Sequence, residues 1–258
     1  MTIQGTYGLC PDQFWDQAGL PSADACNERP DQFKRKVLDP ADIVWAAEVT
    51  TFGGTHFDSL VVTAATTGTI TLTTPGVLLV DSAATAADLG VCVQTKNPWL
   101  AVTAGKKYGV LSCYKVTDTL IGAQYFNGLM EIVTATHGSG VFVSKDYVGY
   151  GADATTIAAD SDGCFFVRDS ADSGTEATTN IGTLVEDTYA WVGFVVDGIS
   201  SARVWLNGVW YATTIATKMP AAATALYPTF ACLCEPTTTD PILAVSHFEA
   251  RWEVDTGI

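Results

Sequence analysis

The segment 202–212 constrains the fold more than any other part of the sequence, because it predicts a β-hairpin together with its register. It reads ARVWL, then Asn207-Gly208, then VWYA. Asn-Gly between two alternating apolar runs is typical of a two-residue type I′ turn, in which both turn residues need a positive φ. The cross-strand pairs that this turn predicts are Leu206 with Val209, Trp205 with Trp210, and Val204 with Tyr211.

Both faces of this hairpin are apolar. Arg203, Trp205, Trp210 and Ala212 share one face, and Val204, Leu206, Val209 and Tyr211 share the other. Such a hairpin belongs inside a larger sheet or against a partner. Trp205 and Trp210 could stack on a sugar, but a cross-strand aromatic pair is more typical of sheet packing or a subunit interface. The interface interpretation favours a homo-oligomer, a trimer above other states.

From residue 41 on, short runs rich in Thr, Val and Gly alternate with turn residues. The strands that they predict are 43–50, 59–62, 68–72, 77–80, 90–95, 108–116, 128–134, 140–145, 163–168, 189–196, 202–206, 209–213, 227–233 and 242–254. So many short strands with few helices indicate an all-β fold, an antiparallel sandwich or barrel. No repeat of 20 to 50 residues is visible, which argues against a propeller or a solenoid.

Charge excludes two classes of partner. With Lys+Arg 13 against Asp+Glu 28, the formal net charge is −15, which repels both phosphate backbones and anionic lipid. We therefore expect neither nucleic acid nor a membrane as a partner. No apolar run approaches the roughly 18 residues needed to span a bilayer, and the first 20 residues carry no signal-peptide pattern.

Residues 1–40 differ from the rest and predict a separate N-terminal arm before a sandwich of residues 41–258. The tetrapeptide PDQF occurs twice, at 11–14 and 30–33, and proline followed by aspartate favours a helix start. We therefore expect short helical turns at 11–17 and 30–37. The arm holds six acidic and four basic residues, which leaves 22 acidic against 9 basic in the sandwich.

The arm is either a solvated, partly ordered terminus or a segment that docks on an acidic partner. Its aromatic side chains have little local core, and cations beside exposed rings suit a docking segment. The candidate docking residues are Phe14, Trp15, Arg29, Phe33, Lys34, Arg35 and Lys36. On this hypothesis the sandwich folds without residues 1–40.

The last expected strand separates two faces by strict alternation. Ala244, Ser246, Phe248, Ala250, Trp252 and Val254 are expected in the core, and Val245, His247, Glu249, Arg251 and Glu253 on the opposite face. The polar row is either a solvated sheet face or a ligand face formed by His247, Glu249 and Arg251. Glu249 and Glu253 lie roughly 13 Å apart along a strand, so they are not by themselves the carboxylate pair of a glycosidase.

The seven cysteines indicate buried, reduced thiols, because their number is odd and no export signal is visible. Cys10 and Cys26 flank a proline-rich segment and could form a disulfide in an oxidising environment. The spacing of Cys and His residues does not predict a zinc site. We assign no catalytic, cofactor or metal residues.

The order of strands and turns resembles a known family. TYAWVGFVVDGISSARVWLNGVWYATT, LYPTFACLC and PILAVSHFEARWEV, within 188–254, resemble the C-terminal half of concanavalin A-like sandwiches. Upstream, GKKYGVLSCYKVTD, NGLMEIV, GVFVSKD and CFFVRDSADSGTEATTNIGTLVEDTYAW extend this order over 43–254 and resemble lectin-like sandwich proteins of tailed-bacteriophage virions.

The resemblance implies a concanavalin A-like jelly-roll β-sandwich in a virion structural protein, a capsid decoration or head-fibre protein that is not an enzyme. It implies assembly in bacterial cytoplasm and contact with the major capsid protein or other virion proteins. It carries over no functional residue. The alternatives are a carbohydrate-binding adhesin that uses the His247, Glu249 and Arg251 face and, less favoured, a glycosidase.

Overall fold

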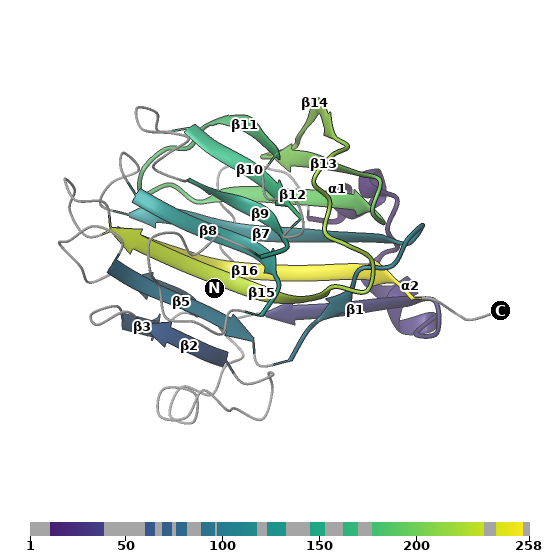
Figure 1. The fold of residues 1–258 in the computed structure, drawn as a ribbon, viewed down its shortest axis with the longest axis horizontal. Coiled ribbons are helices and arrows are strands. Elements are labelled where there is room, and N and C mark those ends of the chain that lie inside the picture. Colours follow the sequence, from purple (N-terminus) through teal and green to yellow (C-terminus); the bar gives the residue numbers. More distant parts are fainter. Residues whose placement is uncertain are drawn as a thin grey trace.

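The protein is a two-layered β-sandwich. The computed structural model describes residues 11–38, 60–64, 69–73, 76–81, 89–95, 97–117, 123–132, 145–152, 162–169, 177–234 and 241–254. These residues form two helices and sixteen strands in two sheets (Figure 1). No helix in these ranges is long and apolar enough to cross a membrane.

Sheet A contains the first and last described strands of the chain. Its members are β1 (Phe33–Leu38), β3 (Thr69–Thr73), β4 (Val77–Asp81), β7 (Lys107–Thr117), β12 (Ala190–Asp197), β13 (Ser201–Leu206), β14 (Val209–Ile215) and β16 (Ile242–Glu253). The order is β14-β13-β12-β7-β16-β4-β3, with antiparallel neighbours. β16 is long enough to pair with β4 along its first residues and with β1 along its second half. In Figure 1 the purple β1 accordingly lies beside the yellow β16.

Sheet B lies opposite. Its members are β2 (Leu60–Ala64), β5 (Leu89–Thr95), β6 (Leu100–Ala101), β8 (Ala123–Met130), β9 (Tyr147–Ala152), β10 (Asp162–Arg168), β11 (Ala177–Thr183) and β15 (Ala225–Cys234). The order is β11-β10-β9-β8-β15-β5-β2, and β6 pairs with β15.

The main core fills the space between the sheets. Phe194 of sheet A packs against Phe165 and Tyr150 of sheet B, with ring centroids 5.4 and 5.9 Å away. Phe248 and Phe230 meet edge to face across the same layer at 5.1 Å. Alternate side chains of each strand supply this layer, so the predicted antiparallel sandwich is confirmed.

The hairpin forms as predicted at its turn. Asn207 and Gly208 have φ values of 45° and 95°, and Trp205 pairs with Trp210 and Leu206 with Val209. The third predicted pair, Val204 with Tyr211, is wrong. A bulge shifts the register between Trp205 and Arg203, so that Arg203 lies opposite Thr214.

The last strand contains a second bulge, between Val245 and His247. From His247 on, the predicted faces are right: Phe248 and Ala250 are buried in the core, and Trp252 packs against it. Before the bulge the faces are reversed, because the extra residue inverts the alternation. Leu243 and Val245 therefore face the core in place of the expected Ala244 and Ser246.

The N-terminal segment departs most from expectation. The helix expected at 11–17 is α1 (Pro11–Ala18), but α2 (Ala23–Glu28), which the Ser22 side chain caps, was not predicted. The helix expected at 30–37 is wrong, because Phe33–Leu38 pairs with β16 as a strand. β6, β9 and β11 were also missed, and β8 begins at Ala123 rather than Gly128. The strand expected at 43–50 and residues 140–144 of the strand expected at 140–145 lie outside the described residues.

Candidate binding surface on the outer face of sheet A

The outer face of sheet A is built from rows of side chains that the antiparallel register aligns across neighbouring strands. The Trp191 row contains His247, Cys113 and Trp191; the Gly193 row contains Glu249, Leu111, Gly193, Trp205 and Trp210; the Gly109 row contains Arg251, Gly109, Val195 and Arg203; the Asp197 row contains Lys107, Asp197 and Ser201.

Helix α1 covers the two middle rows. Phe14 and Trp15 are 0% and 1% exposed, and the Phe14 ring stacks on Trp210 with centroids 5.5 Å apart and packs on Trp205 at 5.4 Å. The Trp210 indole N–H donates to the Gln17 side-chain oxygen at 2.7 Å. A second apolar core therefore lies outside the sandwich layer, between α1 and sheet A.

Two glycines make room for this segment. A Cβ at Gly193 would lie 2.5 Å from a Phe14 ring carbon, and a Cβ at Gly109 would lie 2.9 Å from Leu20. The Gly193 carbonyl also accepts a hydrogen bond from Tyr150 on the core side of the sheet. Strand glycines that admit a close neighbour are therefore the sequence signal for the α1 site.

We expect Gly193→Ala to lower the free energy of unfolding by about 1 to 3 kcal/mol, because the added methyl group overlaps the Phe14 ring. Urea denaturation followed by tryptophan fluorescence measures this loss. Phe14→Leu combined with Gly193→Ala should lose less than the sum of the two single losses, since the smaller side chain makes room. Unchanged unfolding of Gly193→Ala would contradict the packing of Phe14 on this glycine.

The expectation that Phe14 and Trp15 are exposed docking anchors is therefore wrong, because the protein's own sheet buries both. Helix α1 covers Trp205, which is 2% exposed, and the half-buried Trp210. This face of the hairpin therefore no longer supports a subunit interface. The homo-oligomer, with a trimer favoured, remains a prediction without that support.

An ion cluster centred on the buried Glu249 joins the same segment to β16. The Glu249 carboxylate lies 2.7 Å from Nε of Arg35 and 2.7 Å from Nε of Arg251, and Nε2 of His247 lies at 3.5 Å. Burial acts to raise the pKa of Glu249, but the hydrogen bonds from His247 and Arg35 and the charge of Arg251 lower it to about 2. The carboxylate is thus held ionised inside the structure.

Arg251 connects this cluster to the helices. Its guanidinium donates to the Pro21 carbonyl at 2.6 Å and lies over the Trp15 ring, 4.3 Å from the centroid. Glu249 and Arg251 are only 4% and 2% exposed. The expected ligand face of His247, Glu249 and Arg251 is therefore wrong for the last two residues, since residues 11–38 cover them.

The remaining docking candidates divide into two groups. Arg35 belongs to the ion cluster, and the Lys36 amine lies 5.8 Å from the Trp99 ring centroid. Arg29 and Lys34 are exposed, and Phe33 is half-buried. Of the seven residues, Arg29, Lys34 and Arg35 are thus exposed, and of these Arg35 is already paired with Glu249.

Four cysteines behave as expected: Cys26, Cys92, Cys113 and Cys232 are buried thiols outside any disulfide. Burial raises the pKa of the Cys92 thiol to about 12 and that of Cys113 to about 11. Cys26 is not in a disulfide, and Cys10, the other half of the possible bridge, lies outside the described residues. Within the described ranges no three His, Cys, Asp or Glu residues are grouped to hold a metal ion.

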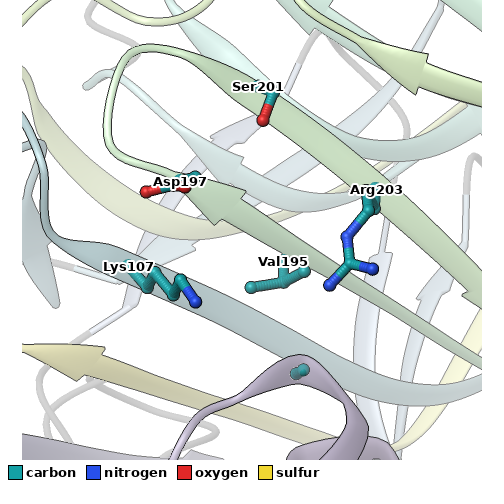
Figure 2. Close-up of a pocket in the computed structure, with 6 residues that line it drawn as sticks. Lys107, Val195, Asp197, Ser201 and Arg203 are labelled. Atoms are coloured by element: carbon teal, nitrogen blue, oxygen red, sulfur yellow. The ribbon is translucent and has the colours of Figure 1, made fainter.

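The Trp191 row and the Asp197 row, which flank the two middle rows, are less covered by α1. Trp191 and His247 are half-buried, with ring centroids 5.5 Å apart, and the Trp191 backbone N–H donates to Asn207 Oδ1 at 2.9 Å. At the opposite end of α1 the Asp197 row borders a pocket of about 200 Å³ lined by Ala18, Lys107, Val195, Asp197, Ser201 and Arg203 (Figure 2). The pocket residues had not been singled out in the sequence, because the register of three strands brings them together.

No protein-family model and no curated protein sequence matches the chain. Solved structures do resemble it. A protein of unknown function from Shewanella oneidensis MR-1 has a TM-score of 0.56 at 14% identity, over 96% of both chains. Peanut lectin has a TM-score of 0.56 at 10% identity, over 86% of this chain and 99% of the lectin.

A β-glucanase from Bacillus licheniformis has a TM-score of 0.54 at 9% identity, over 86% of this chain and 98% of the enzyme. At such identities the likeness extends to the fold alone. Lectins and glucanases of this kind share the concanavalin A-like jelly roll. The chain therefore has a concanavalin A-like β-sandwich fold, as the sequence resemblance implied.

Proposed function

We propose that this chain is a non-enzymatic structural protein of a bacteriophage virion, a capsid decoration or head-fibre protein, assembled in bacterial cytoplasm. The succession of strands and turns over 43–254 supports the virion role, because it resembles such proteins. The docking segment proposed from the sequence is occupied within the chain, so the contact with the major capsid protein or another virion protein lies on the sandwich itself.

Two highly exposed valines indicate where on the sandwich this contact lies. Val185 and Val209 are 64% and 63% exposed, and both lie at the end of sheet A where β12 begins. Val209 pairs with Leu206, which lies opposite Val192 near the start of β12. In the turn that contains Val185, the Asp187 backbone N–H donates a hydrogen bond to the Val116 carbonyl. We call Val185 and Val209 the β12-end surface; exposed apolar side chains at one end of a sheet on an acidic protein suit a protein contact.

Purified particles and a matched pair of variants test this role. Mass spectrometry of particles from the encoding phage should find the chain in many copies, and added protein should sediment with particles that lack it. Val209→Glu should weaken this binding by at least about tenfold, whereas Thr213→Glu, at an exposed position of the same strand, should not. Absence of the chain from purified particles would refute the virion role; equal binding of both variants would refute the proposed surface.

Glycan binding is the second candidate, and the half-buried Trp191 ring beside His247 favours it, since an indole face can stack on a sugar. Two solved structures of the same fold are lectins, from peanut and winged bean. A glycan array would show binding that Trp191→Ala removes. If no glycan on the array binds, the glycan-binding role has no support.

A further inference from the structure

Two cationic side chains, Lys107 and Arg203, line the pocket at the C-terminal end of α1, and neither takes part in the side-chain contacts described above. Lys107 and Arg203 form no ion pair with a carboxylate anywhere in the described ranges. Figure 2 shows the Lys107 amine and the Arg203 guanidinium directed toward each other across Val195. With Asp197 the pocket carries a net charge of +1, on a protein whose formal net charge is −15.

The backbone holds the pocket residues in place. Asp197 lies opposite both Lys107 and Ser201, and Val195 lies opposite Arg203, so three adjacent strands supply the walls. The turn between β12 and β13 is fixed by a hydrogen bond from the Gly198 N–H to the Lys106 carbonyl at 3.0 Å and one from the Ser200 N–H to the Asp197 carbonyl at 2.9 Å. A site on rigid strands needs little ordering when a ligand binds.

The Arg203 guanidinium is also oriented, because it lies over the Trp210 ring, 4.8 Å from the centroid. Stacking of this kind fixes the guanidinium plane while its N–H groups stay available to an anion. Lys107 has a structural role as well: a Cβ at Gly19 would lie 3.5 Å from its amine, so the cation sits near the negative end of α1. Neither contact neutralises the positive charge.

We propose that this pocket binds a small hydroxylated carboxylate, such as a single sugar acid. Arg203 and Lys107 would bind the carboxylate, since a guanidinium pairs with it through two hydrogen bonds. Asp197 and Ser201 would accept hydrogen bonds from hydroxyl groups, and Val195 and Ala18 would contact the C–H face of the ring. A volume of about 200 Å³ is below the roughly 300 to 1,000 Å³ of sites for drug-sized ligands and suits one monosaccharide.

Titrations of the full chain with D-glucuronate, D-glucose, acetate and inorganic phosphate, followed by ¹H–¹⁵N NMR, test the proposal. Glucuronate should shift the amide signals of residues 197–203 with a Kd of about 1 mM, a weak affinity that fits so small a ligand. Glucose and acetate, each of which offers half of the recognised chemistry, should bind at least about fivefold more weakly. No shift near the pocket with glucuronate at ~10 mM, or equal or tighter binding of acetate or phosphate, would overturn the proposal.

Variants locate the site. Arg203→Gln should weaken glucuronate binding about tenfold, because it removes a charge-assisted pair, and Lys107→Gln should act in the same direction. Lys34→Gln removes an equal charge at an exposed position of β1 and should leave affinity unchanged. Thermal unfolding of each variant separates a lost ligand contact from a lost structural one. If both pocket variants bind as tightly as the original chain, the pocket is not the site.

Discussion

Removal of residues 1–38 is expected to leave a sandwich that aggregates or unfolds, the opposite of what the sequence suggested. The outer face of sheet A would then expose Leu111, Val195 and Trp205, which are now 0%, 5% and 2% exposed. Truncation of one buried Phe or Trp to alanine costs about 3 to 5 kcal/mol of folding stability, and the deletion removes two such side chains, Phe14 and Trp15. Whole domains are stable by only about 5 to 15 kcal/mol, so little stability would remain.

Solubility, binding of a hydrophobic dye and urea denaturation measure this effect. The double variant Phe14→Ala with Trp15→Ala should reproduce much of it without shortening the chain, though by less than the sum of the single losses, because the two rings touch at 4.8 Å. Lys34→Gln serves as a control, since its side chain is exposed. A truncated chain that stays soluble and unfolds cooperatively would instead restore the independent arm.

The sequence was sufficient where a pattern is local. The Asn207-Gly208 turn defines the hairpin because only a few residue types tolerate two positive φ values in succession. Alternation along 247–253 predicted the faces of β16 because the side-chain period of a strand is two. The fold class followed from many such short patterns acting together.

What the sequence could not provide depends on long-range contacts. Local propensity favours a helix after Pro30, but edge pairing with β16 makes Phe33–Leu38 a strand, so tertiary context overrides propensity. Likewise Glu249 and Arg251 look like a solvated row until Arg35, 214 residues away from Glu249 in sequence, lies beside them. The bulges in β14 and β16 leave no local sign that alternation shifts.

Glu249→Gln is expected to destabilise the fold by about 3 to 5 kcal/mol at neutral pH, because it leaves the buried Arg251 cation without its carboxylate. The acid sensitivity of the fold should change with it. The pKa of Glu249 is about 2 in the folded protein against an ordinary 4.5, so its contribution, on the order of 3 kcal/mol, is fully present above pH 4.5 and is lost as the pH falls toward 2.

Urea denaturation at several pH values between 7 and 2 tests both parts of this prediction. The original chain should lose stability over the range from about pH 4.5 to 2 more steeply than Glu249→Gln does, since the variant has no proton to bind at that site. Glu28→Gln changes the same side-chain type at an exposed position of α2 and should leave both the stability and its pH dependence close to those of the original chain. Combining Glu249→Gln with Arg251→Met should cost less than the sum of the single losses, because the second change removes the cation that the first leaves unpaired. If Glu249→Gln unfolds at the same urea concentration as the original chain at pH 7, the ion cluster does not hold residues 11–38 on sheet A, and the α1 aromatic contacts alone must do so.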